Sequence, residues 1–152
     1  MTSAKLPGKF DKKKATAFWD RNPCGGEWAE LAAQMNWRYS KEPWIKDIVA
    51  RLTTGMGTVL EVGCGPALDT ILIAERAKEV IGMDLSYKSL VKANENFKTC
   101  GSGNIKLING DAENISFRDN LMDAVYSYGV LHHTAHIKDA LTEIHRDRNI
   151  IL

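Results

Sequence analysis

The chain has 152 residues, of which 44% are hydrophobic and 26% charged, and its formal net charge is +1. These values are typical of one ordinary soluble domain that can bury a core, and they argue against a membrane protein or a strongly basic nucleic-acid-binding protein. The N-terminus is basic rather than apolar, which argues against an export signal and predicts a cytoplasmic protein with no membrane partner.

Residues 1–40 are expected to form a helical extension in front of a main domain at 41–152. Short helices are predicted at 12–20 and 27–35, on either side of a turn-rich segment. A further helix is predicted at 41–54, because a proline stands in its first turn and its apolar residues share one face. This third helix should pack on the sheet of the main domain.

The segment that follows joins a strand to a glycine turn. Residues 58–62 form a short, apolar, β-branched run of the kind found in buried parallel strands. Gly63 and Gly65 come directly after it, where a tight turn needs positive φ and where backbone N–H groups can approach a ligand closely. The next residues, 67–77, have helical apolar spacing, so the turn opens onto a helix N-terminus. This layout predicts a site for a nucleotide-type cofactor.

Two side chains, Leu68 and Glu61, distinguish between classes of nucleotide-type cofactor. A second strand at 80–84 ends in Asp84, which could accept hydrogen bonds from both hydroxyls of a ribose. A dinucleotide fingerprint would place a third glycine where this chain has Leu68. Glu61, in the first strand, would repel a diphosphate and favour a cationic amino-acid group. The cofactor should therefore carry an ammonium, and a nucleotide-linked oxidoreductase is the disfavoured alternative.

Strands and helices continue to alternate along the rest of the chain. Further strands are predicted near 105–109 and 123–128, and helices near 86–99 and 137–146. Right-handed crossovers between such units give a parallel sheet in the order 3-2-1-4. The expected fold class is α/β, a Rossmann-like parallel sheet with helices on both faces, and residues 150–152 could begin a short fifth strand.

Taken together, these segments resemble the class I S-adenosylmethionine-dependent methyltransferases. The first motif of that family, an acidic residue followed by x-Gly-x-Gly-x-Gly, is matched from Glu61 to Ala67, with alanine as the third glycine. Further matches follow in order at Asp84, at 109–113, at 122–133 and at 139–146. Ordered matches over roughly 90 residues are a strong signal, whereas the glycine turn alone would be weak.

The resemblance implies that the cofactor is S-adenosyl-L-methionine, with S-adenosyl-L-homocysteine as its product. The cofactor-binding residues that it implies are Glu61, Gly63, Cys64, Gly65, Asp84, Leu85, Asp111, Ala112, Glu113, Tyr128 and Gly129. Among them, Asp84 would hold the ribose and Asp111 would meet the adenine. The segment that begins at Tyr128 would form the floor beneath the sulfonium.

The resemblance also suggests a role for the aromatic extension. In methyltransferases with leaders of this type, helices that precede the sheet often fold over the cofactor and exclude water, and an aromatic wall suits a sulfonium. Phe18, Trp19 and Tyr39 are therefore candidates for lining the pocket beneath a lid formed by residues 1–40, although packing in the core is the favoured role.

Three histidines form the pattern His-His-x-x-His. His132 and His136 could share a helix face, as metal ligands do, but no Glu or Cys nearby completes a ligand set, so no metal is expected. By the resemblance, His132 and His133 would lie nearest the methyl acceptor, where a histidine could serve as general base. They are the candidate catalytic residues, although methyl transfer mainly requires proximity and in-line alignment.

The predicted function is S-adenosylmethionine-dependent methyl transfer to a small-molecule acceptor. The segment 127–132 lacks the Asn/Asp-Pro-Pro-aromatic pattern associated with amino-group methylation of nucleic acids, so nucleic acid is not the expected partner. After Arg146 the family continues with further strands that this sequence does not supply. The alternative function is therefore a non-catalytic module that binds the cofactor or a partner protein. A homodimer is suggested as a cover for the exposed edge at 123–128.

Overall fold

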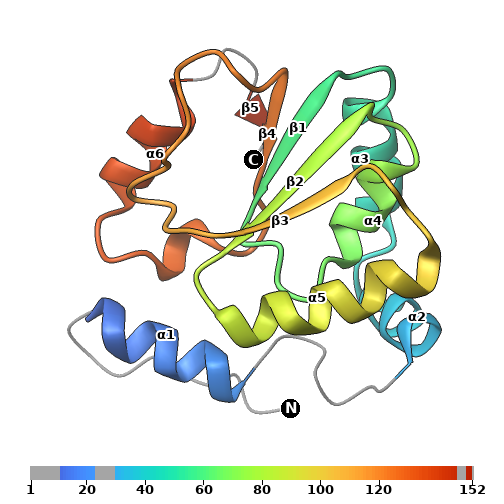
Figure 1. Cartoon of the computed structure of the whole chain (residues 1–152), viewed down its shortest axis with the longest axis horizontal. Coiled ribbons are helices and arrows are strands. Elements are labelled where there is room, and N and C mark those ends of the chain that lie inside the picture. The colour runs from blue at the N-terminus through green and yellow to red at the C-terminus, as the bar shows by residue number, and fades with distance from the viewer. Residues whose placement is uncertain (1–10, 23–29, 147–149, 152) are drawn as a thin grey trace.

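The computed structural model describes residues 11–22, 30–146 and 150–151, and within them the strands form one parallel sheet. Figure 1 shows this sheet with helices on both sides. Its strands are β1 (Thr58–Val62), β2 (Glu79–Asp84), β3 (Ile105–Asn109), β4 (Ala124–Tyr126) and β5 (Ile150–Ile151). They run in the order β3-β2-β1-β4-β5, so the expected α/β class and the order 3-2-1-4 are confirmed.

Helices lie on both faces of the sheet and beyond one of its ends (Figure 1). They are α1 (Lys12–Arg21), α2 (Leu31–Lys41), α3 (Trp44–Thr53), α4 (Leu68–Ala74), α5 (Tyr87–Cys100) and α6 (Ile137–Ile144), with a short 3-10 helix, η1 (Leu131–His133). Because successive side chains of a strand point to opposite faces, β1 contributes to two cores. Val59 packs with buried residues of α3 and α4, whereas Leu60 packs with those of α6. The sheet therefore has α3 and α4 on one face and α6 on the other (Figure 1).

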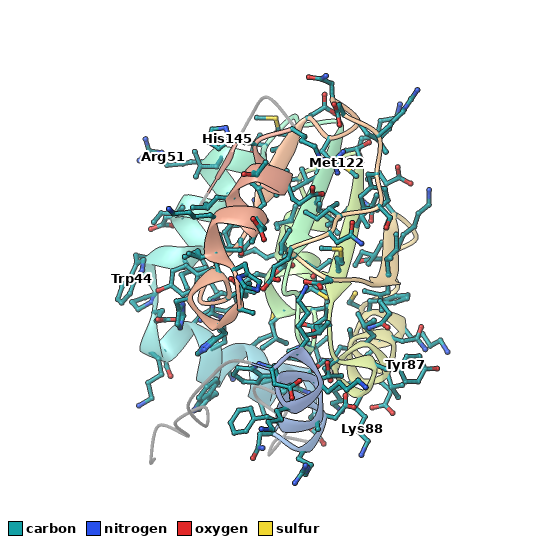
Figure 2. All side chains as sticks on the ribbon, turned by 90° about the vertical axis from the view of Figure 1, so that its left-hand side faces the viewer. Trp44, Arg51, Tyr87, Lys88, Met122 and His145 are labelled. Atoms are coloured by element: carbon teal, nitrogen blue, oxygen red, sulfur yellow. The ribbon has the colours of Figure 1, made fainter. Side chains whose placement is uncertain are left out.

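The outer helices bury one side and expose the other. On α3, Ile45 and Val49 are buried against the sheet, whereas Trp44 is 51% exposed and points outward (Figure 2). Tyr87, at the start of α5, is 67% exposed and also points into solvent. Among the described residues, no helix combines the length and the apolar character that crossing a bilayer requires.

The helix expected at 27–35 is found as α2, but it extends to Lys41 and its predicted end is wrong. Positions 27–29 lie outside the described residues. Contacts that its polar sequence does not reveal hold α2 to other helices both before and after residue 35. Gln34 exchanges hydrogen bonds with Asn96 of α5, and Tyr39 donates one to Asp69 of α4.

The strand expected at 123–128 is shorter than predicted. It comprises Ala124–Tyr126, because Gly129 takes a φ of 72° and turns the chain toward η1. β5 pairs in parallel with Val125 and Tyr126, so the short fifth strand is confirmed and the expected unpaired edge at β4 is wrong. The reason for expecting a homodimer, which was to cover that edge, therefore no longer holds, and nothing in the described part of the chain supports a dimer.

Candidate functional site

A cavity of about 390 Å³ lies where the carboxyl ends of the strands face α1 and α2. Its floor comes from the segments that follow β1, β2, β3 and β4, and its outer wall comes from the first two helices. In Figure 1, α1 lies beyond the end of the sheet, next to the beginning of α5. Open parallel sheets bind ligands at this edge.

The glycine turn after β1 has the backbone shape that its sequence predicts. Gly63 and Gly65 have φ values of 78° and 52°, and Ala67, at the third glycine position, also takes a positive φ of 64°. The backbone N–H groups of Gly63 and Cys64 donate to the carbonyl of Met83, at 2.7 and 3.0 Å, which fixes the turn against β2.

The two glycines differ in what surrounds them. A Cβ on Gly63 would come within 2.3 Å of a methyl group of Val130, whereas one on Gly65 would meet no atom within 4 Å. Both residues line the cavity. Gly63 is therefore required by packing, and Gly65 leaves space that a ligand can occupy.

Asp84, at the end of β2, is fixed by the backbone on both sides. One carboxylate oxygen accepts from the N–H of Gly65 at 2.8 Å, and the other accepts from the N–H of Ser86 at 2.8 Å. Burial raises the pKa of Asp84, and these two backbone hydrogen bonds act in the opposite direction. Because a carboxylate oxygen can accept more than one hydrogen bond, Asp84 can still receive hydroxyl groups in the cavity.

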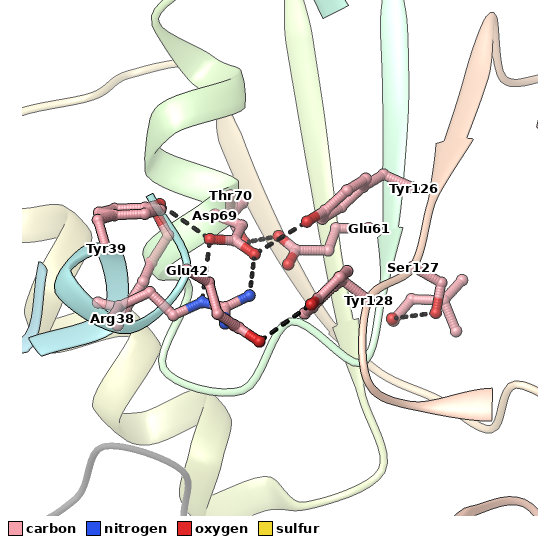
Figure 3. A network of polar contacts seen from close by, with 11 residues as sticks. Arg38, Tyr39, Glu42, Glu61, Asp69, Thr70, Tyr126, Ser127 and Tyr128 are labelled. Atoms are coloured by element: carbon pink, nitrogen blue, oxygen red, sulfur yellow. Dashed lines mark hydrogen bonds and ion pairs between the residues drawn. The ribbon is translucent and has the colours of Figure 1, made fainter. Parts of the chain in front are cut away.

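Behind the turn, Glu61 and Asp69 are two carboxylates at the centre of a polar network (Figure 3). Glu61 is 4% exposed and accepts from the hydroxyl of Thr70. Burial raises the pKa of Glu61 well above its ordinary value, and the charge of Asp69 raises it further. Asp69 itself accepts from the guanidinium of Arg38 at 2.8 Å and from the hydroxyls of Tyr39 and Tyr126 at 2.8 and 3.0 Å.

Arg38 extends this network to the outer wall of the cavity. A second nitrogen of its guanidinium pairs with Glu42, and the hydroxyl of Tyr128 donates to the same carboxylate at 3.0 Å. The guanidinium carbon also lies 5.1 Å from the centre of the Tyr128 ring. Arg38, Glu42 and Tyr128 all line the cavity.

Helix α1 is held over the cavity at both of its ends. At its first turn, the ammonium of Lys12 lies 2.7 Å from Asp111 and 2.8 Å from Glu113. Near its last turn, Asp20 accepts from the hydroxyl of Ser86 at 2.6 Å. These contacts tie the helix to the segments that follow β3 and β2.

The cavity brings together most of the residues that the sequence implicated. Those that line it are Trp19, Glu61, Gly63, Cys64, Gly65, Asp84, Leu85, Asp111, Ala112, Glu113, Tyr128, Gly129 and His133. The ring of Trp19 lies edge-on to that of His133, with centroids 5.1 Å apart. Burial lowers the pKa of His133, as does the neighbouring His132, so its imidazole is mainly neutral at pH 7.

Three candidates do not line the cavity: Phe18 and Tyr39 pack against neighbouring side chains, and for His132 the catalytic role stays a prediction. Phe18 packs edge-on against Trp19, with ring centroids 5.0 Å apart. Tyr39 is 5% exposed and lies behind the cavity wall, where Asp69 binds its hydroxyl. His132 is exposed and its ring lies against that of His133, with centroids 3.8 Å apart and the ring planes tilted by 46°.

The histidines do not lie on one helix face either. His132 and His133 belong to η1, and His136 is the residue that precedes α6. In the described ranges, no group of three or more His, Cys, Asp or Glu side chains could hold a metal ion.

The sequence reasoning missed Lys12, Trp37, Arg38 and Glu42, which complete the outer wall. Trp37 and Arg38 belong to α2, which was expected to end at residue 35, and Glu42 follows the last residue of that helix. The spacing of Arg38 and Glu42, an opposite-charge pair four residues apart, is a signal of a continuing helix that could have found them.

A family model described as "Methyltransferase domain" matches residues 60–147. Demethylmenaquinone methyltransferase of Geobacillus kaustophilus (strain HTA426) is 35% identical over 107 residues, which cover 68% of this chain and 46% of that protein. The enzyme of the same name from Staphylococcus epidermidis (strain ATCC 12228 / FDA PCI 1200) is 34% identical over 107 residues, covering 68% and 44%. This chain thus spans less than half the length of these curated relatives.

Solved structures share the fold at lower identity. The cyclase SpnF matches 95% of this chain and 59% of its own, with a TM-score of 0.71 and 18% identity. A putative S-adenosyl-L-methionine-dependent methyltransferase from Methanococcus maripaludis matches 96% of this chain and 63% of its own, with a TM-score of 0.65 and 22% identity. Because a cyclase is among these structures, the fold alone does not determine the reaction.

Proposed function

This chain belongs to the class I S-adenosylmethionine-dependent methyltransferase family, and on that premise we propose that it binds S-adenosyl-L-methionine in the cavity and transfers its methyl group to a small-molecule acceptor. The observation that carries the proposal is the junction of Asp84 and Gly65. A partly buried carboxylate at the end of β2 is held by the N–H of a glycine whose side-chain position is open. The hydroxyl groups of a ribose beside this turn could donate hydrogen bonds to the Asp84 carboxylate, and the open position at Gly65 would leave space for the sugar.

The other lining residues fit the remaining parts of the cofactor. We assign Asp111 and Ala112 to the adenine, and Glu61 and Gly63 to the amino-acid end. Bound S-adenosylmethionine would supply an electrophilic methyl group on a sulfonium cation. The carboxylates that line the cavity are Glu42, Glu61, Asp69, Asp84, Asp111 and Glu113. They outnumber the lining cations Lys12 and Arg38, and a cavity lined mainly by one sign of charge attracts the opposite sign.

For the acceptor, we propose a flat, largely apolar small molecule with a hydroxyl group. Trp19 and Trp37 of the outer wall and Tyr128 of the floor supply aromatic surface, and His133 supplies a neutral imidazole that could accept a proton. The curated relatives are named demethylmenaquinone methyltransferases, so a quinol of that type is the first acceptor to test.

Calorimetric titration with S-adenosylmethionine, S-adenosylhomocysteine and NAD tests the cofactor, and transfer of a labelled methyl group to the reduced quinol tests the acceptor. We expect micromolar binding of the first two ligands and none of NAD.

His133→Gln should lower methyl transfer about 100-fold while the affinity for S-adenosylhomocysteine is unchanged, because general-base catalysis typically contributes that much or more. Binding without transfer to any hydroxyl acceptor would favour the non-catalytic alternative, and binding of NAD alone would overturn the proposal.

We also propose that α1 acts as a lid over the bound cofactor. Trp19→Ala should weaken binding of S-adenosylmethionine about tenfold, since the loss of an aromatic wall beside a cation costs roughly 1–2 kcal/mol. Phe18→Ala is the matched control, because it removes a neighbouring ring of the same helix that does not line the cavity. Equal losses in the two variants would mean that α1 only needs to be folded, and the lid would be rejected.

A further inference from the structure

Arg38 pairs with two carboxylates that differ in how firmly they are held. Asp69 has a side chain that is only 6% exposed, and it also accepts from two buried tyrosine hydroxyls. Glu42 has a side chain that is 29% exposed and stands between α2 and α3, just after the last residue of α2. Asp69 is therefore a fixed partner of Arg38, whereas Glu42 can turn toward solvent.

The contacts to Glu42 have the form of a carboxylate-binding site. A guanidinium nitrogen of Arg38 donates to one oxygen of the Glu42 carboxylate, and the hydroxyl of Tyr128 donates to the other at 3.0 Å. Figure 3 shows Glu42 between Arg38 and Tyr128, with Asp69 above the guanidinium of Arg38. Paired donors of this kind recognise carboxylates with geometric selectivity. Both donors line the cavity, so a ligand there could reach them.

Building on the proposed function, we propose that Arg38 and Tyr128 bind the α-carboxylate of the cofactor's methionine part, and that Glu42 occupies this site until the cofactor displaces it. Arg38 also contacts Asp69, which adjoins Thr70, the hydrogen-bond partner of Glu61. One continuous network can thus receive both ends of a zwitterion, with the carboxylate at Arg38 and the ammonium on the side of Glu61.

Displacement follows from the charges around Arg38. A ligand carboxylate placed beside Arg38 while Glu42 stays would add a third anion to one guanidinium. Like charges at such short separation repel strongly where water is partly excluded. Exchange of one carboxylate for another avoids this repulsion and leaves both donors satisfied. In the free protein, the Glu42 carboxylate therefore occupies the position that the α-carboxylate of the ligand would take.

The test compares S-adenosylmethionine with decarboxylated S-adenosylmethionine, which lacks only this carboxylate, in three variants. Glu42→Gln should tighten binding of S-adenosylmethionine about fivefold, because it removes the competing anion. A general electrostatic role for Glu42 predicts the opposite sign, since the ligand is a cation. Tyr128→Phe should weaken S-adenosylmethionine about fivefold and leave the decarboxylated ligand unchanged. Glu75→Gln, in an Arg–Glu pair outside the cavity, is the matched control.

Both cavity variants keep the partly buried pair of Arg38 and Asp69, so they should fold. Equal effects on the two ligands, or weaker binding of S-adenosylmethionine to Glu42→Gln, would overturn the carboxylate site. A third ligand, 5′-methylthioadenosine, separates this outcome from failure of the proposed function, since it has the adenosine but no amino-acid part. If it binds and the carboxylate has no selective effect, only the carboxylate site is wrong. If no adenosine ligand binds at all, the proposed function fails as well.

Discussion

Asp84→Ala is expected to raise the dissociation constant of S-adenosylhomocysteine about 30- to 150-fold. The side chain would supply two charge-assisted hydrogen bonds to the ribose, and their loss, partly replaced by water, corresponds to roughly 2–3 kcal/mol. The two backbone N–H groups that now bind Asp84 hold its carboxylate in a fixed orientation, so little ordering remains to be done when the ligand binds. Calorimetry with the purified variant measures the change directly.

Stability should change much less than affinity in this variant. Burial raises the pKa of Asp84, so above that pKa the ionised carboxylate is less favourable in the folded protein than in the unfolded chain. Its removal should therefore alter the free energy of unfolding by no more than about 1 kcal/mol at neutral pH. Glu79→Gln is the matched control, because Glu79 is the first residue of the same strand and lies at its opposite end, away from the cavity. A folded Asp84→Ala protein with the affinity of the parent would remove Asp84 from the site.

Much of this site could be predicted from the sequence because its floor follows strand ends. Glu61, Asp84 and Asp111 lie in or directly after strands whose apolar runs are easily recognised, and parallel strands bring their carboxyl ends to one edge. The β1 and β3 bounds, 58–62 and 105–109, agree with the prediction for the same reason. Here local pattern and tertiary placement point to the same answer.

The outer wall could not be predicted in the same way because its position depends on long-range contacts. Past residue 35, Asp69 of α4 supplies partners for Arg38 and Tyr39 of α2, and Asn96 of α5 binds Gln34 just before it. Tyr39 and Arg38 are neighbours in sequence, but the helix turns one into the core and the other toward the cavity. Aromatic composition identified the extension as important without showing which of its rings would face the ligand.

Substitution of Gly63, which is packed against Val130, is expected to have a large effect on stability. Gly63→Val should lower the free energy of unfolding by roughly 3–5 kcal/mol, because it combines a β-branched residue at positive φ with overpacking. Its φ is 78°, and its new Cβ would lie 2.3 and 2.5 Å from the two methyl carbons of Val130. Denaturant unfolding of the variant measures this loss.

Gly65→Ala separates packing from ligand binding at the same turn. Its φ is 52° and its Cβ would meet no atom within 4 Å, so it should lose only about 1 kcal/mol of stability while its added methyl group hinders the ligand.

A double mutant identifies the clash at Gly63: Val130→Ala should recover part of the stability lost in Gly63→Ala, since two of the three crowding atoms are the Val130 methyl carbons. Additive losses in that pair would show that backbone conformation alone requires glycine at position 63. The turn would then be set by φ, and its contact with the segment after β4 would be incidental.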